Sequence, residues 1–556
     1  MRSLPYLSRQ ALVYHYGVSV ATDSLKSLRR LIGNFRAGLL GRPPDYAVLE
    51  VSGSLPEFAP RLGPLRRRLA PFPSGPSLEG LRGALEAVSY DGRPAGVVLR
   101  IRGLDAGWAA LEELRGELLR FREAGGRVVA YLREDADSRA YYLACAADEL
   151  LASPLATLGV TGLRSRVVFA REALERAGLR AEVLAVSPYK SAYDALSRTG
   201  FSRESREQAE RLLDARFSEL VGAVAGARGM TEEAVRKLID RAPFPAREAL
   251  EAGLLDGVCY EDELPERLGG ARVEGWREAR RSLRFPPGRP RRRKVGLVSV
   301  SGVIVRGRSR SLPIPLPFFG REQAGAESVA AALRAAGKNR RVASVLLHVE
   351  SRGGDALASD LIWREVVRLR RSKPVVVLMG NFAASGGYYV GAGADRIVAR
   401  RNTLTGSVGV VLLRPVASGL YGRLGLRPEV LQRGANAGIL DPATEPGPGE
   451  LAALRRQLEY AYREFRERVA SGRRISRERL EGLAGGRVWT GEEARRAGLV
   501  DGTGGFREAL RLAGELGGVR ADGPGAVVRI RAREVPAAPP PAAGLWAIMP
   551  YDVCDI

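Results

Sequence analysis

The sequence predicts an α/β fold built twice in tandem, and three observations support this prediction. Short runs rich in β-branched residues, such as 342–349 (VASVLLHV) and 373–379 (KPVVVLM), alternate with amphipathic stretches such as 328–339 (SVAAALRAAGKN). This alternation is typical of helices packed on largely parallel strands. The length of 556 residues exceeds what one hydrophobic core usually holds, so at least two domains are expected. The third observation is an internal duplication.

The duplication is seen where YYLACAADELLASPLATLGVTG, starting at Tyr141, resembles YYVGAGADRIVARRNTLTGSVGV, starting at Tyr388. Tyr388 minus Tyr141 and Gly406 minus Gly159 both give an offset of 247. Further along, RAGLVDGT resembles EAGLLDGV at an offset of 245. Because chance similarity does not hold register in this way, we interpret the chain as two copies of one domain.

The domain boundaries are placed where the composition changes and where the repeats end. The segment Arg284–Lys294 (RFPPGRPRRRK) is rich in Pro, Gly and Arg, which is typical of an exposed linker. The predicted parts are an N-terminal extension (1–43), a first domain (44–283), the basic linker (284–294), a second domain (295–518) and a C-terminal tail (519–556).

The formal net charge of +24 raises the question of a polyanionic partner. The arginines are scattered through every segment and mixed with Glu, without aromatic platforms or a known nucleic-acid motif, so we expect no nucleic acid. Attraction to an anionic membrane surface uses the same charge without sequence readout. The three cysteines indicate neither a disulfide framework nor a metal cluster.

The N-terminal extension contains no apolar stretch long enough to span a membrane, and no signal peptide is recognised there. Over 24–42, however, Leu25, Leu28 and Ile32 recur at helical spacing among Lys and Arg residues. This pattern predicts an amphipathic helix that either lies in a membrane interface or packs on its own domain. A peripheral membrane association is therefore expected.

A candidate nucleophile lies in the segment VVVLMGNFAASGGYY. A strand is predicted to end near Gly380 and a helix to begin at Ser385, which places the Ser385 hydroxyl at a helix N-terminus. Gly386 and Gly387 allow a substrate backbone to approach, and the free N–H groups there can stabilise an oxyanion. Small residues at a turn also serve packing, so this motif does not decide the function by itself.

A second glycine-rich turn follows the strand VLLHV. Gly353 and Gly354 offer N–H groups that complete an oxyanion hole with Gly386. Turns that follow neighbouring parallel strands meet at one edge of the sheet, which is the usual place for a site in α/β folds. The two motifs are thus expected to converge.

The base that activates the serine has to be something other than histidine. The only histidines are His15, in the extension, and His348, in a predicted strand. The sequence therefore gives little support for a Ser/His/Asp triad and lacks the histidines for a His-rich metal site. Six of the 87 basic residues are lysine, and one of them, Lys190, lies in VSPYKSAYDAL without basic neighbours. A buried lysine can lose its proton near neutral pH, which arginine cannot do.

Together these segments resemble the signal peptide peptidase A family, in its long form with two tandem domains, over about 44–518. The family's A-S-G-G-Y-Y segment is matched around Ser385 and its Y-K-S-A segment around Lys190. Its T-G-S-V-G segment is matched around Ser407, which the resemblance implies to hydrogen-bond the lysine. Where the family commonly has S-P-G-G, this chain has Ser351-Arg352-Gly353-Gly354, with arginine in place of proline and both glycines present.

The resemblance carries further expectations. It implies two tandem homologous Clp protease/crotonase-like domains and a serine endopeptidase with a Ser/Lys dyad, without a cofactor or metal. The implied substrates are cleaved signal peptides and other short apolar peptides at a bacterial cell membrane. A homo-oligomer, a tetramer by resemblance, is also implied.

The repeat register predicts a division of labour between the copies. At offset 247, Lys190 corresponds to Ala437, and Ser385 corresponds to Ser138, which is followed by Arg139 and Ala140 instead of two glycines. Each copy thus retains half of a site, and Ser138 is interpreted as a relic.

Two other readings of the sequence remain open. A crotonase-like acyl-CoA enzyme shares the related fold and also uses an oxyanion hole, but it needs catalytic carboxylates. The only acidic residue beside the glycine turns is Asp355. A non-catalytic membrane scaffold is the other reading, and it predicts that replacing Ser385 or Lys190 by Ala is silent.

Overall fold

The computed structural model of the chain describes residues 13–15, 20–39, 42–59, 76–288, 291–316, 320–523, 525–532 and 545–548. Their contacts divide the chain into two compact units. The smaller unit consists of 20–164 and 213–290, and the larger unit consists of 1–19, 165–212 and 291–556. The segment 165–212, which belongs to the first sequence repeat, therefore packs in the unit that holds the second repeat.

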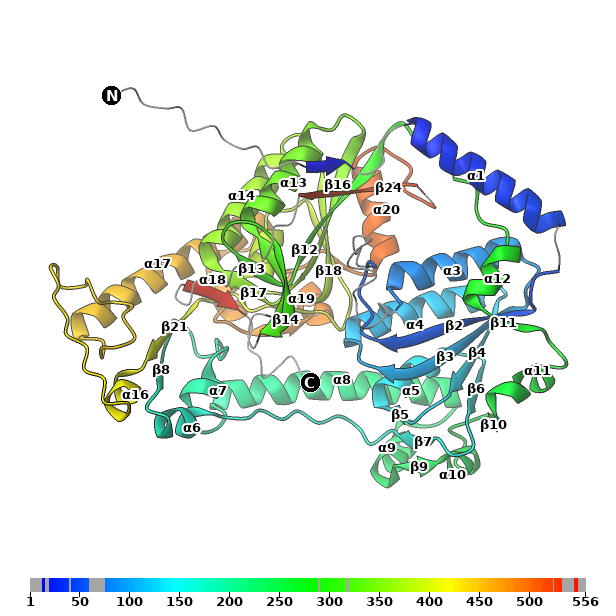
Figure 1. Cartoon of the computed structure of the whole chain (residues 1–556), viewed down its shortest axis with the longest axis horizontal. Helices are drawn as coiled ribbons and strands as arrows, with labels where there is room; N and C mark the ends of the chain where they lie inside the picture. The colour runs from blue at the N-terminus through cyan, green and yellow to red at the C-terminus, as the bar shows by residue number, and fades with distance from the viewer. Residues whose placement is uncertain are drawn as a thin grey trace. The chain divides into compact units, whose positions relative to one another are not determined.

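The smaller unit is built on a six-stranded sheet whose neighbouring strands are all parallel, in the order β10-β6-β4-β3-β2-β11 (Figure 1). These strands are β2 (Tyr46–Gly53), β3 (Gly96–Leu104), β4 (Arg127–Leu132), β6 (Glu149–Ala152), β10 (Gly257–Val258) and β11 (Val273–Gly275). A small second sheet contains β5 (Ala136–Asp137), β7 (Thr157–Gly159) and β9 (Phe244–Pro245).

The larger unit contains a nine-stranded sheet with the order β1-β24-β12-β16-β18-β19-β23, to which β20 and β22 attach through β18. Its strands are β1 (Val13–His15), β12 (Lys294–Ser301), β16 (Val342–Ser351), β18 (Val375–Ala384), β19 (Arg396–Ala399), β20 (Leu404–Gly406), β22 (Val488–Thr490), β23 (Gly502–Thr503) and β24 (Val527–Ala532). Almost every residue of β16, including His348, is buried, as in a parallel sheet covered on both faces.

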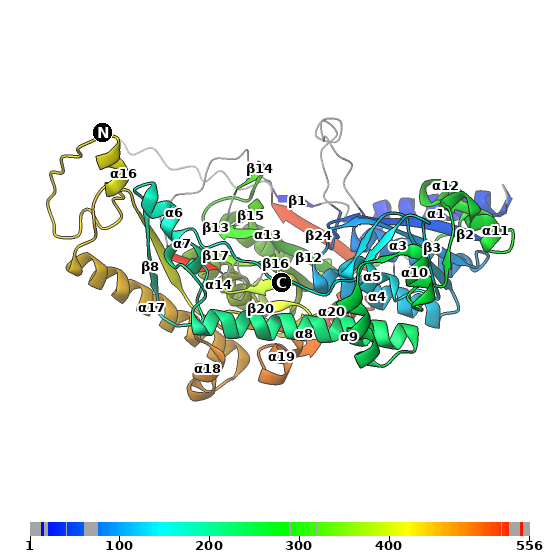
Figure 2. The same cartoon turned by 90° about the horizontal axis from the view of Figure 1, so that it is seen from below.

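A seven-stranded sheet in the same unit has the order β14-β15-β13-β17-β25-β21-β8. Its strands are β8 (Arg180–Ala185), β13 (Val303–Val305), β14 (Arg310–Leu316), β15 (Gly320–Gly325), β17 (Gly353–Asp355), β21 (Val411–Val416) and β25 (Leu545–Ile548). Figure 2 shows β8 beside β21, and six residue pairs join them antiparallel. This pairing ties the stretch that carries Lys190 to the second repeat.

The helices follow the alternation that the sequence predicts. In the smaller unit they are α1 (Val20–Leu39), α3 (Leu78–Asp91), α4 (Trp108–Glu123), α5 (Ser138–Ala144), α9 (Glu232–Arg241), α10 (Ala246–Glu251), η1 (Glu261–Glu263), α11 (Leu264–Arg267) and α12 (Trp276–Ser282). In the larger unit they are α6 (Arg171–Arg176), α7 (Asp194–Ser197), α13 (Ala326–Lys338), α14 (Ala356–Arg370), α15 (Gly386–Gly391), α16 (Ser418–Arg423), α17 (Pro448–Arg473), α18 (Arg477–Leu483), α19 (Gly491–Ala497) and α20 (Phe506–Leu516). Helix α8 (Arg203–Arg228) contributes residues to both units.

The duplication reappears in the strand order. The order β10-β6-β4-β3-β2 of the smaller unit matches β23-β19-β18-β16-β12 of the larger one. Local contacts are duplicated as well, since the Tyr141 hydroxyl donates to the Leu254 carbonyl (2.7 Å) and the Tyr388 hydroxyl to the Leu499 carbonyl (2.8 Å). Each copy thus fixes its first tyrosine of the YY pair in the same structural role.

The N-terminal helix expected over 24–42 is present as α1, Val20–Leu39. Its apolar side chains are largely exposed, with exposed fractions of 70% for both Phe35 and Leu39. Among the described residues, no helix combines the length and hydropathy that crossing a bilayer requires.

Candidate active site

Ser385 occupies the junction between strand β18, which ends at Ala384, and helix α15, which begins at Gly386. Its backbone has φ 56° and ψ −117°, a conformation that costs a non-glycine residue on the order of 1–3 kcal/mol. The Ser385 N–H donates to the Gly406 carbonyl at 2.8 Å, which holds this sharp turn in place. The side chain is fully buried. Ser385 lies at a strand-to-helix turn as expected, but strand β18 continues to Ala384, past the predicted end near Gly380.

The second glycine after Ser385 is required by packing. A Cβ at Gly387 would lie 2.6 Å from the Ser351 carbonyl oxygen, so helix α15 can approach the turn after β16 only because that position is glycine. Gly354 is similarly constrained, since a Cβ there would lie 2.0 Å from the Ile304 carbonyl oxygen and its φ is 158°. The two glycine-rich turns therefore meet, as the parallel strand order predicts.

Lys190 lies between β8 and α7 and is 1% exposed. Its Nζ is 2.6 Å from Ser385 Oγ, 2.9 Å from Ser407 Oγ and 3.0 Å from the Ser407 carbonyl oxygen. The two serines singled out from separate motifs are thus within hydrogen-bond distance of the Lys190 amine. All three belong to the larger unit.

The electrostatic environment favours the neutral form of this amine. Burial lowers the pKa of Lys190 well below its usual value, because the ammonium loses its hydration. The described oxygens within hydrogen-bond distance come from two serines and carry no formal charge. A neutral amine can accept a proton from a hydroxyl, which is the property a general base needs.

Ser407 also has an unusual backbone, with φ 51°. Its N–H donates to the Arg487 carbonyl at 2.7 Å, which fixes the turn after β20. Ser385, Ser407 and Arg474 are the non-glycine residues with positive φ in the described part of the chain, and two of them contact Lys190. Strain of this kind is typical of sites whose geometry is fixed by the surrounding structure.

Gly486, which sequence reasoning did not single out, packs directly against the backbone of Lys190. Gly486 has φ 83°, and a Cβ on it would lie 2.7 Å from the Lys190 backbone nitrogen and 2.8 Å from its Cα. Gly409 packs against the side chain, where a Cβ would lie 3.3 Å from Lys190 Cδ. In the sequence, the consecutive glycines Gly485 and Gly486 were the feature that could have indicated this close contact.

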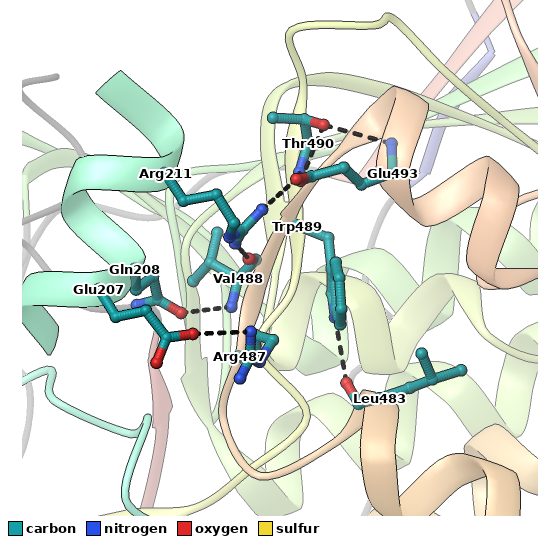
Figure 3. Close-up of polar contacts among 9 residues, drawn as sticks. All are labelled: Glu207, Gln208, Arg211, Leu483, Arg487, Val488, Trp489, Thr490 and Glu493. Carbon is teal, nitrogen blue, oxygen red and sulfur yellow. Dashed lines mark hydrogen bonds and ion pairs between the residues drawn. The ribbon is translucent and has the colours of Figure 1, made fainter. Parts of the chain in front are cut away.

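Polar contacts between α8 and β22 support this arrangement (Figure 3). Gln208 Oε1 accepts a hydrogen bond from the Val488 N–H at 2.7 Å, and Arg211 forms an ion pair with Glu493. The neighbouring Arg487 forms an ion pair with Glu207 at 3.2 Å. The segment that follows Lys190 is thereby fastened to the strand that follows Gly486.

Arg487 also contacts Tyr189, the residue before Lys190. Its guanidinium lies 4.0 Å from the centre of the tyrosine ring and donates to the hydroxyl oxygen. A stacked arginine of this type restrains an aromatic side chain through the π-face and through the hydroxyl. The tyrosine of the YKSA segment thus anchors the lysine from the N-terminal side.

Glu350 stabilises the backbone that leads to Ser385. Strand β18 has extra residues opposite β16, because Val349 pairs with Met379 while Ser351 pairs with Ala383. In this bulge the N–H groups of Asn381 and Phe382 donate to the Glu350 carboxylate at 2.8 and 3.2 Å. The carboxylate thus satisfies donors that the bulge removes from the ladder.

We expect Glu350→Ala to lower kcat for peptide hydrolysis about tenfold with little change in KM, and Glu350→Gln to restore part of the loss. Burial raises the pKa of Glu350 to about 6, although the positive charges of Arg400 and Arg352 act to lower it. His348 lies nearby, since a Cβ on Gly380 would be 3.4 Å from its Nε2. The acceptor strength of the carboxylate therefore falls as the pH drops through 6. A pH profile of kcat should lose an ionisation near pH 6 in Glu350→Gln, and an unchanged profile would contradict this role.

The equivalent serine of the first repeat has a different environment. Ser138 is the first residue of helix α5 and has no positive φ, and its hydroxyl donates to the Gly162 carbonyl at 2.8 Å. The position equivalent to Lys190, Ala437, is an exposed residue with no amine. The described structure thus assembles the serine–lysine arrangement once.

Asp355, the one acidic residue beside the glycine turns, is engaged in structure. Its Oδ1 accepts from the Ala358 N–H at 2.8 Å as the N-cap of α14, and its Oδ2 pairs with Arg306 at 3.0 Å. These contacts leave it poorly suited to the acid–base role that an acyl-CoA enzyme needs.

Comparison with known proteins identifies the family. The sequence model described as "Peptidase family S49" matches residues 120–271 and 368–520, which together exceed half of the chain. The chain belongs to peptidase family S49. The two matches and the parallel sheets confirm the expected fold class of two tandem homologous α/β domains, and the expected relationship to signal peptide peptidase A is also confirmed.

Relatives of known name include "Serine protease SPPA, chloroplastic" from Arabidopsis thaliana, which is 34% identical over 461 residues. That comparison covers 80% of this chain and 66% of the plant protein, so this chain spans slightly less than two thirds of that relative. "Protease 4" from Haemophilus influenzae is 29% identical, with 79% and 73% covered. Among solved structures, ClpP1 from Listeria monocytogenes matches at 15% identity and a TM-score of 0.23, covering 38% of this chain and 94% of that chain. The family match and the two named proteases support a peptidase.

Proposed function

We propose that the protein is a serine endopeptidase in which Lys190 is the general base for the nucleophile Ser385. The observation that carries the proposal is the 2.6 Å separation of Lys190 Nζ and Ser385 Oγ. The lysine is buried, and burial favours its neutral form. Membership of peptidase family S49 supports the same reaction class.

The mechanism follows from this geometry. Neutral Lys190 takes the proton of the Ser385 hydroxyl as Oγ attacks the peptide carbonyl carbon, and the protonated lysine then gives that proton to the departing amine. Lys190 then takes a proton from the water molecule that attacks the acyl-enzyme and gives it to Ser385 Oγ as the ester bond breaks. The N–H groups of Gly354 and Gly386 stabilise the oxyanion, and Ser407 orients the lysine by accepting from its Nζ.

The proposed substrates are cleaved signal peptides and other short apolar peptides at a membrane surface. One relative bears the name "Putative signal peptide peptidase SppA", from Enterococcus faecium. Helix α1 supports peripheral attachment to a bacterial cell membrane, because Leu28, Phe35 and Leu39 are largely exposed on a helix that also carries Arg residues. Equal flotation of the full chain and of a chain lacking residues 1–39 with anionic lipid vesicles would contradict this attachment.

A homo-oligomer, with four chains as the family resemblance implies, is also proposed. Leu424, Val430 and Leu431 are exposed by 64, 48 and 97% within one segment of the larger unit, and exposed apolar side chains in one segment support a protein contact. Sedimentation that finds only monomers at micromolar concentration would contradict this assembly.

Hydrolysis of a fluorogenic apolar peptide tests the proposed reaction. Ser385→Ala is expected to lower kcat by at least about 1,000-fold, since it removes the nucleophile. Ser138→Ala is the matched control, because it removes the corresponding hydroxyl of the other repeat and should leave kcat within twofold. No hydrolysis by the wild type, unchanged in Ser385→Ala, would favour a non-catalytic scaffold, and hydration of an enoyl-CoA that depends on Ser385 would favour the crotonase-like alternative.

A further inference from the structure

The two faces of the parallel sheet in the smaller unit are covered to different extents. Side chains alternate along β3, so Val97 and Leu99 point to one face while Val98 and Arg100 point to the other. The first face packs against helices α3 and α4 in one large hydrophobic cluster. The second face packs against the segment that holds η1 and α11, through Leu264. These two elements supply three and four helical residues, which is little cover for a sheet.

The corresponding segment of the larger unit forms a longer helix. At the offset of 245 between the repeats, α20 corresponds to residues 261–271, and it packs on β16 and β18 as a helix of eleven residues. In the first repeat, α11 already ends at Arg267. Gly269 and Gly270 follow with φ of 74° and 77°, a left-handed conformation that stops a helix. The shorter helix leaves part of the sheet face uncovered.

A pocket of about 310 Å³ lies on this uncovered part, and all of its lining residues belong to the smaller unit. Its apolar walls come from β2, β3, β11 and α11, and include Val98 and Leu264. Charged side chains of both signs also line it, namely Arg100, Glu261 and Asp262. Small-molecule sites have volumes from about 300 Å³ upward and combine apolar walls with a few polar groups. The pocket therefore has the size and composition of a site for a small ligand.

Arg100 provides a hydrogen-bond donor for such a ligand. Its Nη1 donates to Glu261 Oε1 at 2.5 Å, and its Nη2 donates to Glu50 Oε2 at 3.0 Å. Its Nε is buried and has no hydrogen-bond partner among the described residues. Buried donors in folded proteins are nearly always paired, and arginine forms its strongest hydrogen bonds with carboxylates. The Nε–H group thus indicates a ligand that carries an acceptor, and a carboxylate fits it best.

Asp262 provides the opposite charge. Glu261 is already paired with Arg100 and, at 3.5 Å, with Arg133, whereas the carboxylate of Asp262 has no hydrogen bond or ion pair within the part of the chain that the structure describes. A ligand ammonium can therefore bind Asp262 without displacing another group. A ligand with negative charge alone would be repelled by the two carboxylates, and one with positive charge alone would leave the Nε–H of Arg100 unpaired. The pocket favours a ligand with both charges.

We propose that this pocket binds a small zwitterion with an apolar side chain. The ligand carboxylate accepts from Arg100, the ammonium donates to Asp262, and the side chain packs on Leu264. Apolar amino acids and apolar dipeptides share this chemistry. The lining residues include neither Ser385 nor Lys190, so binding at this pocket does not depend on the proposed peptidase activity.

A ligand series tests the chemistry of the site by calorimetric titration of the full-length Ser385→Ala chain, in which no turnover is expected. L-leucine and leucyl-leucine are compared with 4-methylpentanoate, which lacks the ammonium, and with 3-methylbutylamine, which lacks the carboxylate. One of the two zwitterions is expected to bind with a Kd of about 1 mM or below, at least about tenfold more tightly than both partial analogues. The tighter of the two identifies the amino acid or the dipeptide as the occupant. Absence of binding by both zwitterions, or equal affinity for a partial analogue, overturns the proposal.

Substitutions test the location of the site. Asp262 is exposed and its carboxylate has no partner to lose, so Asp262→Asn should fold normally and weaken binding of the zwitterion at least about fivefold. Glu266→Gln is the matched control, because Glu266 is an exposed acidic residue of α11 outside the pocket, and it should leave the Kd unchanged.

Arg100→Gln tests the other end of the ligand. It removes the charged donor, so the variant should no longer distinguish L-leucine from 3-methylbutylamine. If both Asp262→Asn and Arg100→Gln bind the zwitterion with the wild-type Kd, or if Glu266→Gln weakens binding as much as Asp262→Asn does, the ligand binds elsewhere and the proposal is overturned.

Discussion

Replacing Lys190 by Met is expected to lower kcat at least about 1,000-fold and, at the same time, to raise the melting temperature of the protein. Methionine has nearly the length of lysine but no amine, so Ser385 loses its base while the buried space stays filled. The fold gains stability because a lysine with a lowered pKa must give up its proton on folding, and methionine has no such cost. Hydrolysis and thermal unfolding of the same preparation measure both effects.

The sign of the pH dependence follows from the same shift. Between the lowered pKa of folded Lys190 and the usual 10.5, the unfolded chain binds one more proton than the folded chain. The stability advantage of Lys190→Met should therefore shrink as the pH rises toward 10.5. Lys190→Arg is the control, because it restores a cation without a removable proton and should be inactive and less stable than the wild type. Hydrolysis near the wild-type rate in either variant would contradict the role of Lys190.

The second large effect is expected from Gly486→Ala, at a residue that has no part in the chemistry. The added Cβ would lie within 2.8 Å of the Lys190 backbone, at a φ of 83° that alanine rarely adopts. The lysine must then shift, and a displacement of about 1 Å in a reacting group costs about 100-fold in rate. We expect kcat to fall by about that factor.

The control for this substitution lies only four residues away. Gly482 is within helix α18, and a Cβ there meets nothing within 4 Å, so Gly482→Ala should keep full activity and gain slightly in stability. If both alanine variants hydrolyse peptide at the wild-type rate, Gly486 does not position the lysine.

The sequence was informative where a residue type was scarce or a motif was repeated. Lys190 stood out because arginine supplies nearly all other positive charge, and Ser385 because its glycines are missing at the corresponding Ser138. The structure brings these residues and Ser407 to one point, within hydrogen-bond distance of the lysine amine. Their roles in catalysis remain the proposal that the experiments address.

Local sequence patterns could not predict which distant strands pair with each other. Hydrophobic alternation marks β8 as a strand, but nothing in it selects β21 of the second repeat as the partner. The same holds for β25, four residues in a segment interpreted from the sequence only as a C-terminal tail. Strand pairing over such separations is set by tertiary packing.

The sequence likewise predicted neither the strained backbone at the two serines nor the buried carboxylate that accepts hydrogen bonds from the bulge. Serine at positive φ is uncommon, so no propensity predicts the conformation of Ser385 or Ser407. Glu350 followed the strand VLLHV without a motif of its own, and only the bulge in β18 explains why a carboxylate is buried there. These residues become meaningful once the fold places them.

The pH dependence of Ser385 acylation tests the central claim most directly. A serine-directed fluorophosphonate labels the nucleophile without a leaving amine, so its rate reports the base alone. The account predicts a rate that rises with pH through one ionisation well below 10.5, carried by Ser385 and absent in Lys190→Met. A wild-type profile that Lys190→Met reproduces, or a limb at the ordinary lysine pKa, would contradict a neutral Lys190 as the base.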